Sequence, residues 1–224
     1  MNTLRHILKL FLFLTSLLLL SCDSQELTPP VKEKIQVRQY AGTIIAVGDS
    51  LTAGLGVAEN DAWPALMENK LHQDGYNWQV INGGISGETS SGTLSRIRWI
   101  LAQKPEIVVL ETGANDGLRG ISPPVIRKNI SKAVQMLQDG NVTVVLAGMQ
   151  IVQNLGADYA KEFAEIYPAV AGELKCAFVP FILEGVAGEP SLSQADALHP
   201  NEKGYVIIAE TVYPFVLQAV QQAN

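Results

Sequence analysis

From residue 41 onward, short apolar runs rich in β-branched residues alternate with longer segments of amphipathic, helical pattern. The apolar runs predict five strands, at 43–47, 78–81, 107–110, 142–146 and 178–181. The third run is apolar throughout and the fourth is apolar apart from Thr143, which is typical of strands covered on both faces. Strands that alternate with helices require right-handed crossovers and a parallel sheet with helices on both sides. The pattern therefore predicts an α/β fold.

Helices are expected between and after these strands. Their predicted positions are 63–73, 93–104, the stretch between Ser122 and Gly140, 159–171 and 201–223. Ser122 should cap the third helix, and Gly140 should end it. Pro168 should kink or break the fourth helix and Pro214 should interrupt the fifth, because proline lacks the N–H that a helix interior uses. Pro180, within the fifth apolar run, suits a strand at the edge of the sheet.

The first residues are typical of an export signal. Arg5 and Lys9 lead into an apolar run of eleven residues, 10–20, which as a helix would span only about 16 Å of a bilayer core about 30 Å thick. This combination predicts a signal peptide over 1–21. The sequence Leu-Leu-Ser-Cys that ends at Cys22 resembles a bacterial lipobox, which implies cleavage before Cys22, a lipid on its thiol and an acylated amino terminus. An ordinary secreted protein with a chance cysteine is the alternative.

The organisation expected after the signal is a lipidated Cys22 and a polar tether over 22–40, followed by one domain over 41–224. The 18 residues after Cys22 would span roughly 25 Å if flexible, so the domain could turn its face toward the membrane or away from it. If Cys22 is lipidated, Cys176 has no partner, and its apolar surroundings predict a buried, unreactive thiol. We thus expect an exported, membrane-anchored bacterial lipoprotein that faces the periplasm or the cell exterior.

The charge pattern excludes one class of partner. The formal net charge is −6 and no run of Lys or Arg stands out, so the electrostatic footprint of a nucleic-acid-binding protein is missing. No cluster of residues has the spacing of metal ligands, and we expect neither a metal nor another cofactor. We expect the chain to be a monomer.

Polar motifs follow the predicted strands, at the sheet edge where α/β proteins place their sites. The loops after the first three strands contain Gly48-Asp49-Ser50, a glycine-rich stretch ending at Gly87, and Asn115-Asp116. The sequence Asp196-Ala-Leu-His199 lies between the fifth strand and the last helix. All four motifs should therefore converge on one edge.

A nucleophilic serine can be derived from these motifs. Ser50 follows a strand through a tight turn, but a serine needs a base to take its proton. After the signal the chain offers two histidines, and His72 lies near a helix end, where contact with exposed carbonyls is expected. His199 follows Asp196 by three residues, so the carboxylate can fix one ring nitrogen and leave the other to accept the proton of Ser50.

Acyl transfer also needs donors where negative charge develops on the substrate oxygen. The side-chain amide of Asn115 and the backbone N–H groups of Gly87 and Ser50 could supply them. Each motif alone is also typical of a turn or a helix cap. Their order along one sheet edge favours a catalytic site.

The four motifs resemble the conserved blocks of the GDSL or SGNH hydrolases. The matching stretches are Gly48-Asp-Ser-Leu51, Ile85-Ser-Gly-Glu-Thr89, Gly113-Ala-Asn-Asp116 and Asp196-Ala-Leu-His199. The resemblance spans about 43–216 and is closest to the thioesterase I, lysophospholipase L1 and arylesterase branch. It implies a three-layer α/β/α sandwich whose five-stranded parallel sheet has flavodoxin-like order.

The resemblance also implies roles for individual residues. Ser50 would be the nucleophile, His199 the base and Asp196 its partner, while Ser50, Gly87 and Asn115 would form the oxyanion hole. Asp49 would support the turn rather than act chemically. The loop over 117–124 would lie beside the substrate and cover its acyl chain.

The function expected is hydrolysis of a carboxylic ester or thioester through an acyl-enzyme, and lysophospholipids and aryl esters are among the compatible substrates. A carbohydrate acetylesterase of the same family and a non-catalytic surface lipoprotein with a vestigial site are the alternatives. A nucleotide- or flavin-binding module is disfavoured, because the chain has neither a P-loop lysine nor Gly-x-Gly-x-x-Gly after its first strand.

Overall fold

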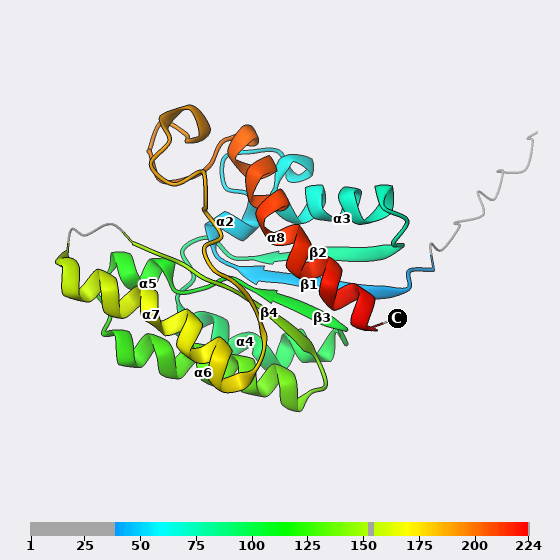
Figure 1. Cartoon of the computed structure of the whole chain (residues 1–224), viewed down its shortest axis with the longest axis horizontal. Helices are drawn as coiled ribbons and strands as arrows, with labels where there is room; N and C mark the ends of the chain where they lie inside the picture. Colours follow the sequence, from blue (N-terminus) through cyan, green and yellow to red (C-terminus); the bar gives the residue numbers. More distant parts are fainter. Residues whose placement is uncertain (1–38, 152–154, 224) are drawn as a thin grey trace, which may run out of the picture. The chain divides into compact units, whose positions relative to one another are not determined.

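The computed structural model describes residues 39–151 and 155–223, and residues 39–224 fall in one compact unit. Five parallel strands form one sheet in the order β2-β1-β3-β4-β5 (Figure 1). The strands are β1 (Gly42–Gly48), β2 (Trp78–Gly84), β3 (Ile107–Leu110), β4 (Thr143–Ala147) and β5 (Ala177–Val179). This order is flavodoxin-like, and the predicted parallel α/β sheet is confirmed.

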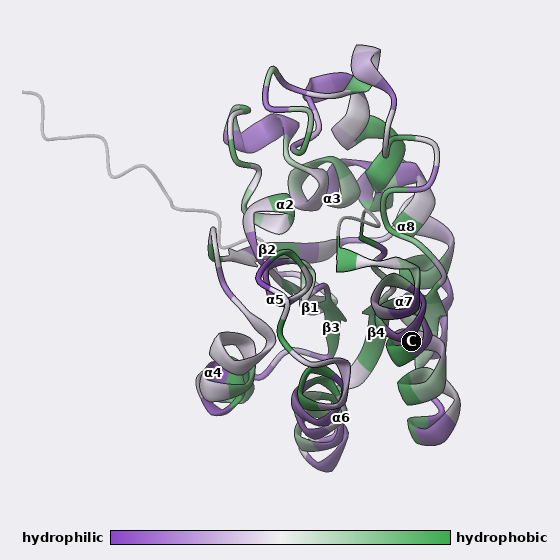
Figure 2. Cartoon of the chain, turned by 90° about the vertical axis from the view of Figure 1, so that its left-hand side faces the viewer, coloured by the Kyte–Doolittle hydropathy of each residue, from purple (hydrophilic) through white to green (hydrophobic). Residues whose placement is uncertain are grey.

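Helices cover both faces of the sheet. On one face α3 (Trp63–Gln73) packs against α8 (Glu202–Ala223); on the other, α6 (Pro123–Asp139) lies between α4 (Ser90–Ala102) and α7 (Ala157–Leu174) (Figures 1 and 2). Two short helices, α2 (Ser50–Ala53) and α5 (Ala114–Leu118), follow β1 and β3 directly. The architecture is therefore the predicted three-layer α/β/α sandwich.

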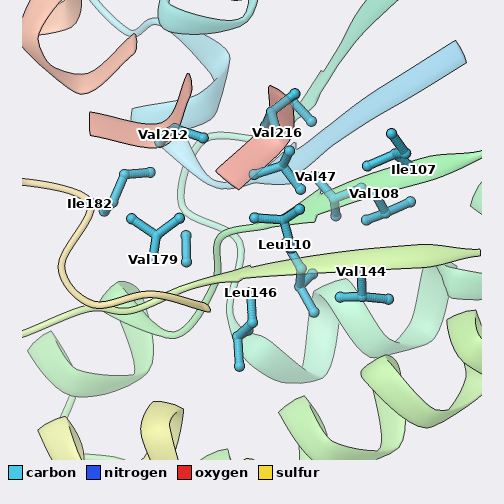
Figure 3. Close-up of a cluster of buried hydrophobic side chains, with 14 of the residues drawn as sticks. Val47, Ile107, Val108, Leu110, Val144, Leu146, Val179, Ile182, Val212 and Val216 are labelled. Carbon is cyan, nitrogen blue, oxygen red and sulfur yellow. The ribbon is translucent and has the colours of Figure 1, made fainter. Parts of the chain in front are cut away.

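The core lies on both sides of the central strands. All four residues of β3 are fully buried, which is why its sequence shows no alternation of polar and apolar residues. Val212 and Val216 of α8 close the core on one face, among the buried side chains that Figure 3 shows. Complete burial of each such side chain stabilises the fold by about 1.5–3 kcal/mol.

A break at Pro168 and an interruption at Pro214 are absent from the described helices. The helix α7 continues through Pro168, and α8 continues through Pro214. Both prolines are exposed and follow directly on a buried residue, Tyr167 in α7 and Tyr213 in α8. Water can satisfy a carbonyl that loses its partner on the exposed side of a helix, and the packed apolar face holds the helix together across the missing bond.

Local details also differ from the sequence expectations. Ser122 occupies the cap position of α6 but its side chain makes no capping hydrogen bond, and Gly140 ends the helix with φ −86°, outside the left-handed region. The strand β5 lies at the sheet edge as expected and ends just before Pro180. Cys176 is half-buried rather than buried, and this partial burial raises the pKa of its thiol.

The predicted signal peptide and Cys22 lie outside the described residues. Within residues 39–151 and 155–223, no helix has both the length and the apolar character needed to cross a bilayer.

Candidate active site

Ser50 is the first residue of α2, immediately after the turn that leaves β1. The carboxylate of Asp49 caps this helix, accepting a hydrogen bond from the backbone N–H of Leu51 at 3.0 Å. Gly48 is enclosed: a Cβ there would lie 2.1 Å from the hydroxyl of Thr52. The turn is therefore compact and fixed on its inner side, with the hydroxyl of Ser50 directed into a cavity that Ser50 helps to line.

His199 and Asp196 meet Ser50 from the other end of the chain. The Nε2 atom of His199 lies 2.8 Å from the hydroxyl of Ser50, and its Nδ1 lies 2.6 Å from Oδ2 of Asp196. The other oxygen of Asp196 accepts the backbone N–H groups of Leu198 and His199, both at 3.0 Å. These hydrogen bonds, above all the one with the imidazole, hold the pKa of Asp196 well below its usual value.

Gly87 and Asn115 line the same cavity as Ser50. Gly87 has φ +80°, a left-handed conformation that glycine adopts without strain. The amide of Asn115 donates one hydrogen bond to Oδ2 of Asp49 at 2.9 Å. An amide nitrogen carries two protons, so Asn115 keeps a second donor for the cavity while Asp49 holds its side chain in place.

A buried carboxylic acid supports the turn from below, and sequence reasoning missed it. Glu111 follows β3, has no exposed surface, and accepts through Oε2 from the N–H of Asp49 at 3.1 Å and the hydroxyl of Thr52 at 3.0 Å. Its Oε1 is buried without a hydrogen-bond partner among the described residues. Burial, assisted by the nearby charge of Asp49, raises the pKa of Glu111 well above its usual value. The one sequence signal was its place directly after the apolar run 107–110.

An ion pair joins the Gly87 loop to the end of β1. Arg96 of α4 binds the carboxylate of Glu88 through Nε and Nη2 at 2.7–3.0 Å, and both side chains are largely buried. Its Nη2 also donates to the carbonyl of Gly48 at 3.4 Å. The guanidinium of Arg96 thus links the carbonyl of Gly48, two residues before Ser50, to the side chain of Glu88, the residue after Gly87.

Asp116, next to Asn115, has a structural contact of its own. Its buried carboxylate accepts the backbone N–H and the hydroxyl of Ser90, each at 2.7 Å. This contact connects α5 to the first turn of α4. The orientation of Asn115 therefore depends on two anchors, Asp49 and Asp116.

The cavity beside Ser50 has a volume of about 640 Å³. Its walls are mainly apolar and include Leu118, Met149, Ile151, Phe181, Leu183 and Val186. Ser50 and His199 lie in its wall. A pocket of this size with few polar groups suits an elongated apolar group next to a reactive bond.

Other residues singled out from the sequence have separate places. His72 lies in the last turn of α3, where its Nε2 contacts the carbonyl of Trp78 at 2.9 Å. The 117–124 loop borders the cavity through Leu118, and the hydroxyl of Tyr159 donates to the carbonyl of Ile121 at 2.6 Å. Among residues 39–151 and 155–223, no group of His, Cys, Asp and Glu side chains could hold a metal ion.

Comparison with known protein families identifies the family to which a chain with these site residues belongs. Residues 46–207, most of the domain, match the GDSL-like lipase/acylhydrolase family. The chain belongs to the GDSL-like lipase/acylhydrolase family. Membership confirms both the resemblance found in the sequence and the prediction that the protein is an ester hydrolase.

Curated relatives of this GDSL-like hydrolase carry related names. Esterase TesA of Pseudomonas aeruginosa is 41% identical over 78% of this chain and 87% of its own length. The arylesterase of Vibrio mimicus is 38% identical over 78% and 88%. Thioesterase 1/protease 1/lysophospholipase L1 of Escherichia coli K12 is 35% identical over 76% and 81%.

Solved structures share the fold of this GDSL-like hydrolase. The crystal structure of TesA matches with a TM-score of 0.77 and 40% identity, over 79% of this chain and 99% of that one. The esterase EstA from Pseudoalteromonas sp., solved with monoethylphosphonate as inhibitor, matches with a TM-score of 0.76 and 32% identity over 79% and 97%.

Proposed function

We propose that the protein hydrolyses carboxylic esters and thioesters by acyl transfer to Ser50. The hydroxyl oxygen attacks the carbonyl carbon while Nε2 of His199 takes its proton. His199 then gives this proton to the departing alcohol or thiol, as the bond between the carbonyl carbon and that group breaks. A water molecule, deprotonated by His199, then attacks the carbonyl carbon of the acyl-enzyme. The bond to Ser50 breaks, the acid is released, and His199 returns the proton to Ser50. The observation that carries the proposal is the continuous hydrogen-bonded chain from Asp196 through His199 to Ser50.

The remaining groups have defined roles in this mechanism. Asp196 keeps the imidazole in one tautomer and stabilises the imidazolium that forms. The N–H groups of Ser50 and Gly87 and the amide of Asn115 donate to the oxyanion, and losing one such donor typically costs about 2.7–4 kcal/mol of transition-state stabilisation. Burial raises the pKa of Glu111 and so favours its uncharged form, whose carbonyl oxygen can still accept hydrogen bonds from the turn that carries Ser50.

We propose substrates with an apolar acyl chain. The apolar cavity next to Ser50 and His199 supports this class, as do the relatives named esterase, arylesterase and thioesterase/lysophospholipase. Long-chain lysophospholipids, acyl thioesters and aryl esters all present such a chain next to a carbonyl. We propose that the acyl chain occupies the apolar cavity and that the leaving group lies outside it.

A substrate series tests the acyl-chain proposal. We expect kcat/KM for p-nitrophenyl esters to rise from acetate to chains of about eight carbons, because each buried CH₂ contributes about 0.8 kcal/mol. Matched thioesters and lysophosphatidylcholines of the same chain lengths should show the same dependence. Rates that are highest for acetate, or for acetylated sugars, would contradict an acyl-chain pocket and favour an acetylesterase.

We further propose that Cys22 carries the lipid anchor of an exported protein. The basic start, the short apolar run and the Leu-Leu-Ser-Cys sequence support this proposal. In cells given radiolabelled palmitate, the full chain should incorporate label and remain with the membranes, whereas Cys22→Ser should lose both properties. Label retained by Cys22→Ser but lost by Cys176→Ser would contradict the proposed position of the anchor.

A further inference from the structure

Exposed apolar side chains gather around the opening of the cavity. The described residues contain ten large apolar side chains that are exposed, and six of these lie in loops or short helices at the carboxyl edge of the sheet. Each of the six is 38–52% exposed. We call this set the apolar rim: Leu55, Ile85, Leu118, Ile121, Leu155 and Leu198.

The apolar rim is continuous with the cavity. Leu55, Leu118 and Leu198 line the cavity itself, and Ile85 is adjacent to two further lining residues, Ser86 and Gly87. Figure 2 looks at the molecule from this edge, with α2 and α5 facing the viewer. An exposed apolar surface that runs into an apolar pocket is typical of an interaction site rather than of a scattered set of surface residues.

The crossover loops explain why the rim forms on one edge. Ile85 follows β2, Leu118 ends α5 beyond β3, and Leu155 lies between β4 and α7. Parallel strands all end at the same edge, so side chains from each of these loops face the same way out of the sandwich. Trp99, by contrast, lies in the last turn of α4, which runs back toward the opposite edge.

One cation lies within the rim. The guanidinium of Arg119 is exposed, and its Nη2 donates to the carbonyl of Gly87 at 3.1 Å. A guanidinium carries five N–H donors, and it can bind a phosphate oxygen while remaining in contact with Gly87. Apolar side chains around a guanidinium match the chemistry of a phospholipid interface, where acyl chains lie beneath phosphate groups.

The length of chain before the domain permits contact with a membrane. The described domain begins at Gln39, ahead of β1 and therefore at the edge of the sheet opposite the rim (Figure 1). A domain of this size is roughly 40 Å across. The 16 residues from Asp23 to Arg38 can reach roughly 55 Å when extended. An anchor at Cys22 therefore leaves enough chain for the domain to turn its rim toward the bilayer.

We propose that the apolar rim docks on the surface of a phospholipid bilayer, with Arg119 at the level of the phosphates. A lipid substrate could then pass from the bilayer into the cavity without exposing its acyl chain to water. This role in substrate access rests on the proposed function. The docking itself does not require catalysis, so it can be tested separately.

The test measures binding of residues 39–224 to vesicles of phosphatidylcholine and phosphatidylglycerol by co-sedimentation. This segment contains the whole described core and lacks the proposed anchor, and solved relatives are matched by it over 97–99% of their chains. We expect the triple variant Ile85→Ser/Ile121→Ser/Leu155→Ser to bind at least tenfold more weakly. None of its three positions lines the cavity, so hydrolysis of a water-soluble short-chain ester should stay within about twofold.

Matched controls separate docking from general loss of apolar surface. The variant Ile81→Ser/Trp99→Ser removes exposed apolar side chains of 38% and 59% exposure away from the rim, and it should bind vesicles like the unmodified domain. Ser50→Ala should also bind normally, so that loss of catalysis and loss of docking are distinguishable. Equal vesicle binding by the rim variant and the unmodified domain would overturn the proposal.

A second measurement applies even if the triple variant folds poorly. In a Cys176→Ser background, an environment-sensitive fluorophore on Ile121→Cys should shift to the blue when vesicles are added, whereas the same label on Trp99→Cys should not. Light scattering, which measures the molar mass in solution, tests whether a second copy of the chain covers the rim instead of a bilayer. A dimer that forms without lipid and dissociates in the rim variant would assign the rim to a second copy of the chain and overturn membrane docking.

Discussion

Replacement of Ser50 by alanine is expected to lower kcat/KM for ester hydrolysis by at least about 10⁴-fold, because removal of a serine nucleophile leaves only binding and oxyanion stabilisation. Covalent labelling by a fluorophosphonate should disappear in the same variant. The EstA structure solved with monoethylphosphonate supports this choice of probe. The measurement is an initial-rate assay with the preferred ester of the chain-length series, at protein concentrations checked by absorbance.

Ser86 offers a matched control for this result. It lines the same cavity as Ser50, and none of the hydrogen bonds that join Ser50 to His199 involves it. Ser86→Ala should retain labelling and stay within about tenfold of the unmodified rate. Labelling that persists in Ser50→Ala and is lost in Ser86→Ala would move the nucleophile to Ser86.

Substitution of Gly84 by alanine is expected to destabilise the domain by about 3 kcal/mol or more, which is the upper range for overpacking. A Cβ at this position would lie 2.2 Å from the backbone nitrogen of Ala53. The end of β2 and the helix α2 must therefore separate, and no side-chain rotation can relieve the clash. Urea unfolding followed by circular dichroism measures the loss. Because Ser50 begins α2, the remaining folded protein should also hydrolyse esters more slowly.

Gly172 provides the opposite case. It lies inside α7, and a Cβ there would meet nothing within 4 Å. Gly172→Ala should raise the free energy of unfolding by about 0.5–1 kcal/mol, the ordinary gain from alanine in a helix interior. If both glycine variants changed stability by the same amount, the close approach of β2 to α2 would not explain the effect at Gly84.

The pattern of apolar residues predicted the strands and helices whose formation depends on the local sequence. The apolar run 107–110 became the central strand β3, bounded as expected, because four consecutive apolar, mainly β-branched residues suit a strand that is buried on both faces. The five strands also appeared in flavodoxin-like order. That order followed from the family resemblance, whereas alternation alone required only that the sheet be parallel.

Contacts between distant segments could not be predicted from local patterns. Nothing near Glu111 indicates that its carboxyl group lies beneath the turn of Asp49, 62 residues earlier in the chain. The ion pair of Arg96 with Glu88 looks, in sequence, like two ordinary surface charges. The same limit explains why the helices α7 and α8 continue through Pro168 and Pro214, since the local cost of proline is visible in the sequence and the packing that outweighs it is not.

The hydrogen bond between His199 and Ser50 joins residues 149 positions apart. During synthesis Ser50 leaves the ribosome long before His199, and all five strands have been made by the time His199 appears. A nascent chain thus carries the hydroxyl of Ser50 before it carries the imidazole that contacts it. Under the proposed mechanism, such a chain would not hydrolyse esters until the segment after β5 has folded and placed His199 beside Ser50.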